Sequence, residues 1–180
     1  GTVTDITYTV RDDLGALSNP STVSVSITPV NDAPVAGPIP DGSTNEDNSL
    51  NNIDVLSFIS DVEGDAVTIT GASAANGTVT VNGDGSLNYV PNPDYNGTDT
   101  ISFSFEDSNG GSSSSSVDVI VAPVNDAPDA GSPPLTTTDE DTSLTNIDVM
   151  VHASDIDGDT LSVTSASATN GTGTINGDGT

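Results

Sequence analysis

Two short acidic stretches hold the side chains best suited to bind a metal ion. Both follow the pattern Asp-x-Asp/Glu-Gly-Asp, and their carboxylates belong to Asp61, Glu63, Asp65, Asp155, Asp157 and Asp159. The glycine lets the chain turn sharply, so that three carboxylates can face one point. Hard divalent cations favour such a set, since Ca²⁺ takes about 6–8 oxygen ligands at roughly 2.3–2.6 Å. The pattern therefore predicts two turns that bind Ca²⁺.

The same acidic turns are open to two competing interpretations. An EF-hand loop begins with similar spacing, but it needs a glutamate at its twelfth position and a helix on each side. The twelfth positions here hold Ala72 and Ala166, and no flanking helix is predicted. The turns could also be acidic loops that only keep the surface solvated. The clustering of the carboxylates favours the calcium interpretation.

The two acidic turns belong to a tandem repeat. The sequence Val-Asn-Asp-Ala-Pro occurs twice, with its asparagine at Asn31 and at Asn125, an offset of 125 − 31 = 94 residues. More than half of the positions from 31 to 86 are identical in 125–180. Chance does not produce such a match over so long a span.

The repeat divides the chain into one complete unit and two partial ones. Residues 5–12 resemble residues 100–107, so the chain begins with the end of a unit. We therefore expect residues 1–30 to be the C-terminal part of a preceding repeat, 31–124 a complete repeat, and 125–180 the N-terminal part of the following repeat. On this interpretation the chain is a stretch of a longer array.

The elements that must position the acidic turns are predicted to be short β-strands. Apolar and polar residues alternate along them, as in strands half buried in a sheet, and turn residues such as those at 82–85 separate them. The predicted strands are 6–10, 23–27, 67–70, 78–81, 86–90, 101–105 and 117–121, with two more between 49 and 59. The serine run 112–116 is predicted to be a solvated loop. About seven short strands in a unit of ~94 residues are typical of an Ig-like sandwich, so the fold class is all-β, with tandem sandwiches joined by short linkers that contain proline.

The alternation also predicts which side chains form the core of the complete unit. The inward set is Leu50, Ile53, Val55, Val67, Ile69, Val79, Val81, Leu87, Tyr89, Ile101, Phe103, Phe105, Val117, Val119 and Val121. Most of these are β-branched, so each buries less area than a leucine or phenylalanine would. The core is therefore thin, and we expect stabilisation from outside it.

Charge and composition exclude several classes of function. The chain has 27 acidic residues, one basic residue, Arg11, and a formal net charge of −26. Nucleic acids and anionic membrane surfaces need lysine and arginine as partners, so neither is expected to bind. No cysteine is present, and no apolar run is long enough to insert into a membrane.

No arrangement of residues points to catalysis. The sequence contains no Ser/His/Asp or Cys/His combination and no glycine-rich phosphate loop. Paired carboxylates can hydrolyse glycosidic bonds, but aromatic residues that would line a sugar-binding cleft make up only 3% of the chain. We therefore expect the protein not to be an enzyme.

The order of these motifs resembles a known family. The Asn-Asp-Ala-Pro junction, the pair Glu46-Asp47, the turn at 61–65 and the stretch 105–111 are similar to the cadherin-like (VCBS-type) tandem repeats of giant bacterial surface adhesins of the RTX type. In that family Ca²⁺ lies between consecutive domains. For the junction at 125, the resemblance implies the ligands Glu46 and, more loosely, Asp94 of the preceding unit, Asn125 and Asp126 of the linker, and Asp155 and Asp157 of the following unit. For the junction at 31, it implies Asn31, Asp32, Asp61, Glu63 and Asp107.

The resemblance implies a function as well as a set of ligands. It indicates a non-catalytic extender repeat of a large extracellular adhesin or surface filament, made rigid by Ca²⁺ between neighbouring repeats of the same chain. Cadherin linkers usually carry one more aspartate where this chain has Pro29 and Pro123, which implies fewer or weaker sites.

Two alternatives remain at this point. The sandwich could itself bind a glycan or a protein partner, although the loops of the two units are nearly the same and few aromatic residues are left outside the core. Residues 1–30 and 125–180 are also nearly complementary parts of one fold, so self-association into filaments is possible.

Overall fold

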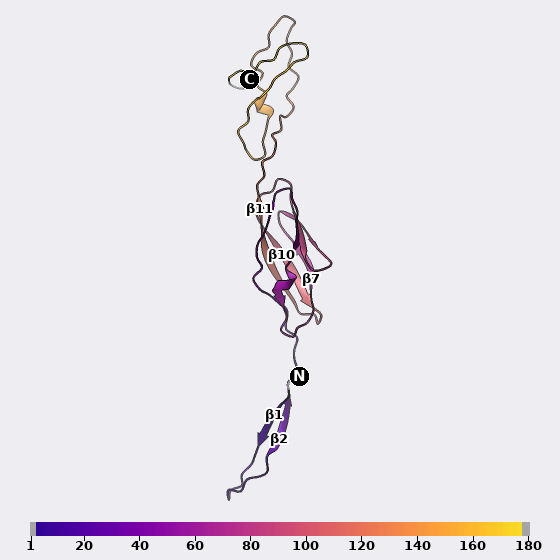
Figure 1. Ribbon diagram of the computed structural model, residues 1–180, viewed down its shortest axis with the longest axis vertical. Coiled ribbons are helices and arrows are strands. Elements are labelled where there is room, and N and C mark those ends of the chain that lie inside the picture. Colours follow the sequence, from indigo (N-terminus) through magenta and orange to yellow (C-terminus); the bar gives the residue numbers. More distant parts are fainter. Residues whose placement is uncertain (1–2, 178–180) are drawn as a thin grey trace.

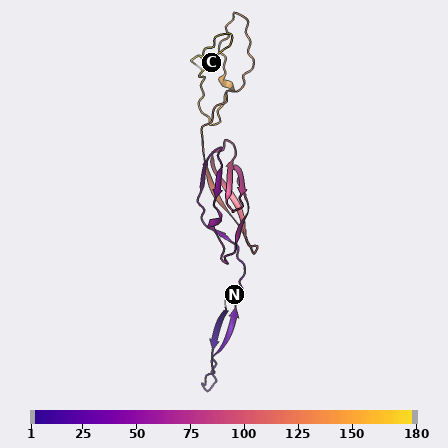
Figure 2. The same ribbon diagram turned by 45° about the vertical axis from the view of Figure 1, so that its right-hand side comes forward.

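The computed structural model describes residues 3–177 and shows an elongated molecule with three parts in a row (Figure 1). A β-hairpin stands at one end, a β-sandwich lies in the middle, and a loop-rich part stands at the other end. The same order is visible after the molecule is turned by 45° (Figure 2). A single stretch of chain joins each part to the next.

The middle part, residues 31–124, is a sandwich of two sheets. Its elements are β3 (Val35–Ala36), β4 (Gly42–Asn45), β5 (Leu50–Ile53), the one-turn 3₁₀ helix η1 (Leu56–Phe58), β6 (Ile59–Ser60), β7 (Val67–Ser73), β8 (Gly77–Val81), β9 (Leu87–Pro91), β10 (Gly97–Asp107) and β11 (Ser112–Ala122). One sheet has the order β4-β11-β10-β7 and the other β5-β9-β8, while β3 pairs with β6. Seven of these strands have four or more residues, so the predicted all-β sandwich is confirmed.

The core of the sandwich lies between the two sheets. Along β10 every second side chain from Asp99 to Asp107 is buried, as the alternating sequence requires. Nine of the predicted inward residues form the buried core, and the other six pack against it, so this prediction is confirmed. The sequence did not indicate six further residues that also pack against the core: Ala36, Ile39, Ile59, Ala72, Ala74 and Tyr95.

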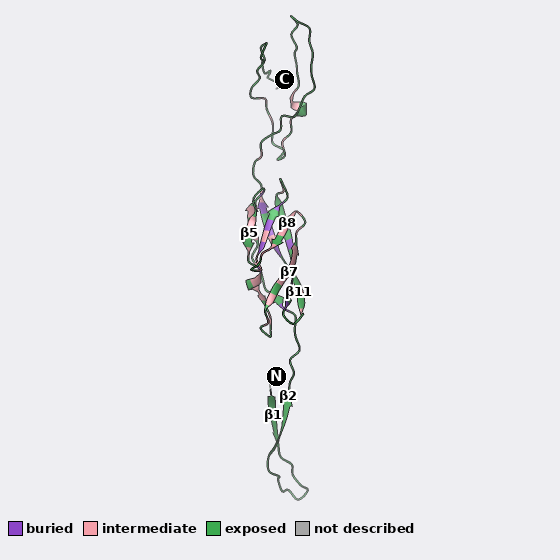
Figure 3. Cartoon of the chain, turned by 90° about the vertical axis from the view of Figure 1, so that its right-hand side faces the viewer, coloured by how far each residue is buried: buried purple, intermediate pink, exposed green. Residues whose placement is uncertain are grey.

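The N-terminal part is a two-stranded hairpin. Strands β1 (Val3–Tyr8) and β2 (Ser21–Ser26) pair antiparallel, and every residue of both strands is exposed. Figure 3 shows the hairpin in green throughout, in contrast to the purple and pink interior of the sandwich. Within residues 3–177, therefore, no sheet packs against either face of the hairpin.

The C-terminal part, residues 125–177, follows the path of the complete unit without forming its strands. The one-turn helix η2 (Met150–His152) corresponds to η1, and the bridge between Asp129 and Ser154 corresponds to the pairing of Val35 with Ser60. Six of the nine buried core side chains in the complete unit come from β10 and β11. Residues 125–177 contain no counterpart of these two strands, which explains why the sheets do not form there.

Two predictions about the complete unit need correction or completion. The serine run 112–116 is not a loop, because it forms the first half of β11 and pairs with β10, with Ser112 opposite Glu106 and Ser116 opposite Ser102. Backbone hydrogen bonds to β10 hold this segment, so the absence of apolar side chains did not matter. Strand β4 was missed for a similar reason, since its residues Gly-Ser-Thr-Asn show no apolar alternation although they pair parallel with β11. In the following unit, the turn that the repeat predicts at 176–179, as the counterpart of 82–85, lies partly outside the described residues.

Helices contribute little to the molecule. The two one-turn helices are the longest helical segments within residues 3–177, and neither has the length or the composition needed to cross a lipid bilayer.

Candidate metal centre

The two acidic turns share one local structure. Oδ1 of Asp61 accepts hydrogen bonds from the backbone N–H groups of Glu63 (2.9 Å) and Asp65 (3.0 Å). In the turn that begins at Asp155, the same two bonds measure 3.0 and 3.1 Å. Gly64 has φ of 78°, which glycine adopts without strain and other residues rarely do. Each turn is therefore held by its own first carboxylate.

The linker before each unit is attached to that unit's acidic turn. The backbone N–H of Asp126 donates a hydrogen bond of 2.8 Å to Oδ2 of Asp157. At the first junction the backbone N–H of Asp32 donates to Oε2 of Glu63 at 3.2 Å. The same contact thus occurs at both junctions, 94 residues apart by the arithmetic 126 − 32.

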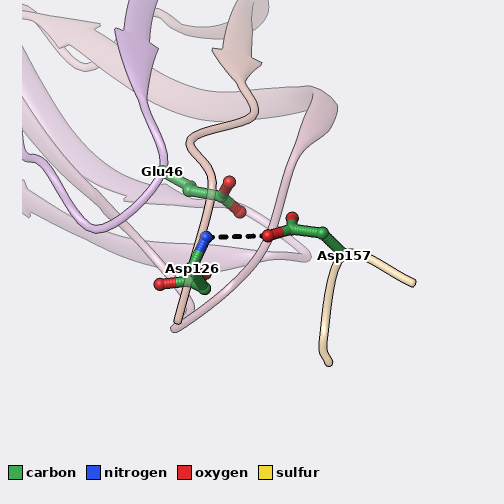
Figure 4. Close-up of side chains that lie close together, drawn as sticks. All are labelled: Glu46, Asp126 and Asp157. Carbon is green, nitrogen blue, oxygen red and sulfur yellow. Dashed lines mark hydrogen bonds between the residues drawn. The ribbon is translucent and has the colours of Figure 1, made fainter. Parts of the chain in front are cut away.

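A cluster of three carboxylates lies where the complete unit meets the following one. Glu46, Asp126 and Asp157 each place a carboxylate oxygen within 4.8 Å of the others (Figure 4). Glu46 directly follows β4 in the complete unit, Asp126 belongs to the linker, and Asp157 belongs to the acidic turn of the following unit. The cluster therefore draws on both units and on the linker between them.

A second cluster shares Asp126 with the first. Carboxylate oxygens of Asp47, Asp94 and Asp126 also lie within 4.8 Å of one another. Asp47 and Asp94 both have φ of 58°, a left-handed conformation that aspartate adopts more readily than most residues. The backbone N–H of Asp94 donates to Oδ1 of Asp47 at 3.3 Å, which joins the two loops. Asp126 is the side chain that connects all five carboxylates.

The environment of Asp126 disfavours its negative charge. Burial raises the pKa of its carboxyl, and the charges of Asp94, Asp157, Asp47 and Glu46 raise it further. Oδ2 of Asp126 is buried and has no hydrogen-bond partner among the described residues. A buried charged oxygen without a partner is costly, so a cation at this point would stabilise the arrangement.

Hydrogen bonds fix the carboxylate of Glu46. The side chain is 2% exposed, and it accepts hydrogen bonds from the backbone N–H of Val124 and, at 3.3 Å, from Nδ2 of Asn96. The backbone N–H of Glu46 donates to the carbonyl of Ala122 at 2.9 Å. These contacts attach the start of the linker to the end of the sandwich.

The first junction is built around Asp107 at the end of β10. Nδ2 of Asn31 donates to Oδ2 of Asp107 at 3.0 Å, and this carboxylate is 5% exposed. Burial acts to raise its pKa, but the hydrogen bonds from Asn31 and from the backbone N–H groups of Gly111, Asn109 and Gly110 outweigh burial and hold the pKa below its usual value. Asp107 is therefore charged in the folded protein and ties the linker to the loop after β10.

Two other carboxylates of the first junction, those of Asp65 and Asp61, have different hydrogen-bonding surroundings. Oδ2 of Asp65 accepts a hydrogen bond of 2.6 Å from Nδ2 of Asn109. Oδ2 of Asp61 is buried and has no hydrogen-bond partner among the described residues, as is true of Asp126 at the second junction. Within residues 3–177 the clusters of three carboxylates occur at the second junction, where a preceding sandwich is present to supply Glu46, Asp47 and Asp94.

Comparison with known proteins bears on both units. Residues 31–120 match the family model described as bacterial Ig domain, and this match covers half of the chain. The chain belongs to the bacterial Ig domain family. Residues 124–180 match the family model described as cadherin-like domain. No curated protein matches the chain.

Membership of the bacterial Ig domain family agrees with the architecture and narrows the class of function. Bacterial Ig and cadherin-like domains are typically non-enzymatic, and they are usually extracellular or exposed at the cell surface. They fit a structural extracellular repeat. Cadherin-like domains also commonly bind Ca²⁺.

Four of the ligands suggested for the second junction of this bacterial Ig protein come together in the clusters: Glu46, Asp94, Asp126 and Asp157. The other two, Asn125 and Asp155, and Asp159 of the same acidic turn have other roles. Nδ2 of Asn125 donates to the carbonyl of Asp126 at 2.9 Å, Asp155 holds the acidic turn, and the backbone N–H of Asp159 donates to Asp155.

Asp47 is the member of the clusters that sequence reasoning did not include. It follows Glu46 directly, and its counterpart Asp141 also has a positive φ, 61° against 58° for Asp47. The Glu-Asp pair in both units was the available signal. A positive φ at the second residue turns it away from the strand direction, which alternation along a strand cannot reveal.

The residues of the second junction suit a hard cation. All five clustered side chains are carboxylates, and Ca²⁺ favours carboxylate and carbonyl oxygens, whereas zinc favours nitrogen and sulfur ligands. The buried, unpartnered oxygen of Asp126 supplies a further reason for a cation to bind. The donor set of this bacterial Ig protein therefore fits Ca²⁺.

Proposed function

We propose that this protein is a non-catalytic extender segment of a large extracellular bacterial adhesin or surface filament, and that Ca²⁺ at the junctions between repeats makes it rigid. Its partners are the neighbouring repeats of the same chain. In this role the segment holds other, ligand-binding parts of the protein away from the cell surface.

One observation carries the proposal: Asp126 of the linker lies between carboxylates of two different units. Glu46, Asp47 and Asp94 belong to the complete unit, and Asp157 belongs to the following one. Without a cation, like charges at about 4 Å repel one another by roughly 4 kcal/mol at the effective dielectric constant near a protein surface. A cation reverses this interaction and joins the two units through the linker.

At the second junction Glu46, Asp47, Asp94, Asp126 and Asp157 would hold the ion, and it would neutralise their charge. At the first junction Asp32, Asp61 and Glu63 lie on the side of the complete unit, where Asn31 and Asp107 already attach the linker. The preceding unit would supply counterparts of Glu46, Asp47 and Asp94 there.

The shape of the molecule supports a role in spanning distance. The three parts follow one another along a single axis (Figure 1). Strands β10 and β11 each have 11 residues, and at about 3.3 Å per residue such a strand spans roughly 36 Å along the unit. A repeated unit of this kind adds length without adding chemistry.

Small-angle scattering of the 180-residue chain tests the proposal. We expect the largest intramolecular distance to be long and sharply defined in millimolar Ca²⁺, and to become shorter on average and more variable in chelator. A glycan array in Ca²⁺ separates the extender from a sugar-binding module, because an extender gives no signal. Reproducible glycan binding traced to side chains of residues 31–124 would replace the proposed function.

A further inference from the structure

Four asparagines of the complete unit are each followed by glycine, and they are Asn76, Asn82, Asn96 and Asn109. Glycine has no Cβ, so its backbone nitrogen can closely approach the side-chain amide of the residue before it. Attack by this nitrogen is the first step of deamidation, which converts asparagine into aspartate at neutral pH. The four sites are alike in sequence, so the surrounding structure decides which of them reacts.

The packing around Gly77 protects Asn76. The backbone N–H of Asn76 donates a hydrogen bond of 2.8 Å to Oδ2 of the buried Asp99. Gly77 begins β8, and a Cβ at this position would collide with the ring of Tyr89 and with the carbonyl oxygen of Val90. A backbone in such close packing cannot bend to bring its nitrogen to the side-chain carbon.

Hydrogen bonds hold both ends of the Asn82 amide. Its Nδ2 donates to Oγ of Ser86 at 2.9 Å and to Oδ1 of Asn88 at 3.0 Å, and its Oδ1 accepts a bond of 3.1 Å from Nδ2 of Asn88. The backbone N–H of Asn82 also donates to the carbonyl of Ser86 at 2.8 Å. Gly83 is exposed, but the amide must break these bonds before it can turn toward the nitrogen of Gly83.

Asn96 has less protection than these two. It is exposed, and its Nδ2 donates a long hydrogen bond of 3.3 Å to Oε2 of Glu46. Gly97, however, is the first residue of β10 and pairs with Val121 of β11. The nitrogen that must attack therefore belongs to a sheet, and it moves only when the end of the strand frays.

Asn109 and Gly110 lie in the turn between β10 and β11. Strand β10 ends at Asp107 and β11 begins at Ser112, so neither residue belongs to a strand. Both are exposed, and a Cβ placed on Gly110 would meet no atom within 4 Å. The backbone N–H of Gly110 donates to the carbonyl of Asp107 at 3.4 Å, which is longer than the usual range of about 2.7–3.2 Å. The attacking nitrogen is therefore weakly held in an open turn.

We propose that Asn109 is the first asparagine of the complete unit to deamidate, with water as the reactant. The nitrogen of Gly110 gives up its proton to hydroxide and forms a bond to Cγ of Asn109. The bond from Cγ to Nδ2 breaks, and the amide nitrogen takes a proton from water and leaves as ammonia. Water then opens the succinimide ring and leaves aspartate or isoaspartate at position 109. In net terms one molecule of water enters for each ammonia released.

Deamidation at this position changes an attractive contact into a repulsive one. Nδ2 of Asn109 donates a hydrogen bond of 2.6 Å to Oδ2 of Asp65, which joins the loop after β10 to the acidic turn at 61–65. A carboxylate at position 109 has no hydrogen to donate, and it would lie beside the carboxylate of Asp65 with the same charge. The reaction therefore loosens the acidic turn from the sandwich and adds a negative charge to the first junction.

The inference goes beyond the proposed function and does not depend on it. The amide of Asn109, the nitrogen of Gly110 and the carboxylate of Asp65 are in place without an ion. Both tests below are therefore made in metal-free buffer, where a negative result bears on the deamidation alone.

Peptide mass spectrometry of the full chain, aged at neutral pH, tests the order of reaction. Asn109 should convert faster than Asn76 or Asn82 by about tenfold or more, which corresponds to a barrier lower by about 1.4 kcal/mol. The same chain unfolded in guanidinium is the matched control, because the four sites should react at similar rates once the structure is lost. Conversion of any of the other three asparagines before Asn109 in the folded chain, or equal rates at all four, would overturn the proposal.

A variant that carries the charge of the product from the start tests the consequence. Asn109→Asp should melt at a lower temperature than Asn109→Ser, because the serine only loses the hydrogen bond to Asp65, whereas the aspartate also adds repulsion. Added sodium chloride should narrow the difference, since salt screens exposed charges. A melting temperature of Asn109→Asp equal to or above that of Asn109→Ser would overturn the claim that deamidation turns this contact repulsive.

Discussion

The backbone N–H of Asp126 donates a 2.8 Å hydrogen bond to the carboxylate of Asp157, which belongs to the following unit. The same contact joins the linker and the acidic turn at the first junction, so it is a property of the repeat. It brings the side chain of Asp126 among four other carboxylates, where burial and their charges raise its pKa. The protein itself therefore positions the linker, and the negative charge gathered around Asp126 favours the binding of a cation.

Calcium is expected to raise the melting temperature. A ligand that binds only the folded state stabilises it by RT ln(1 + [L]/Kd), which is about 2.7 kcal/mol at a hundredfold excess over Kd. Differential scanning calorimetry in millimolar Ca²⁺ and in EDTA measures the shift. Mg²⁺ at the same concentration is the control, because it keeps much of its water and suits a set of protein carboxylates less well. Coincident curves in Ca²⁺ and EDTA would contradict calcium binding.

Asp126→Ala is expected to weaken calcium binding at the second junction at least tenfold, a loss of about 1.4 kcal/mol. The substitution removes the one side chain that both clusters share. Asp41→Ala is the charge-matched control, since Asp41 is exposed and lies in neither cluster. Isothermal titration calorimetry measures both variants against the parent. Equal affinity in the parent and in Asp126→Ala would remove Asp126 from the site.

Acidification in calcium-free buffer is expected to close the second junction, that is, to hold the two units together there. This effect should occur at a higher pH than the destabilisation of the sandwich. The pKa of Asp126 is raised above the ordinary value of 3.8, so the closed junction binds a proton more tightly than the open one. This contribution favours closure below the ordinary value and is lost as the pH rises through the raised pKa. Scattering should therefore report a narrower distribution of shapes as the pH falls from neutral toward 4. An unchanged distribution would contradict the electrostatic account of the junction.

Further acidification is expected to destabilise the sandwich. The pKa of Asp107 is held below the ordinary value of 3.8 by its hydrogen bonds. Its contribution to folding is therefore present above 3.8 and is lost as the pH falls through the lowered pKa. Circular dichroism along the same titration follows this step, and Asp107→Asn should abolish its part of the pH dependence.

Phe103→Ala and Tyr8→Ala are expected to have very different effects on the free energy of unfolding, although the two residues occupy corresponding positions in the repeat. Phe103 is 2% exposed in the core, and truncation of such a side chain costs about 3–5 kcal/mol. Tyr8 is 50% exposed on the hairpin, and in a dilute monomer its truncation should change the stability by less than about 0.5 kcal/mol. Urea unfolding of both variants measures the difference. A large loss for Tyr8→Ala would show that the hairpin packs against the monomer.

The sequence was sufficient to predict the sandwich and its core because both depend on alternation along single strands. Ile101, Phe103 and Phe105 alternate with polar residues, and each lies in the core as expected. The serines of β11 and the polar strand β4 carry no such pattern. These segments are strands because their backbones pair with neighbouring strands. Alternation therefore finds strands that bury side chains and misses strands that only complete a sheet.

The carboxylate clusters of the candidate metal centre could be predicted only in part, because their residues come from separate segments of the chain. The repeat showed that Glu46, Asp126 and Asp157 each belong to a motif that occurs in both units. It could not show that Asp47 joins them, since that depends on a left-handed backbone at a single residue. Nor could it show that Asp65 would be occupied by a hydrogen bond from Asn109. Contacts between loops are fixed by tertiary structure, which leaves little trace in local sequence patterns.

A distance measurement across the second junction tests the central claim most directly. The chain has no cysteine, so Thr80→Cys and Thr164→Cys can carry spin labels at exposed positions on either side of the linker. In Ca²⁺ we expect a narrow distribution of distances between the labels, and in chelator a broad one. The same pair in an Asp126→Ala background should remain broad in Ca²⁺. A distribution of the same width with and without Ca²⁺ in the parent would contradict the claim that calcium joins the two units.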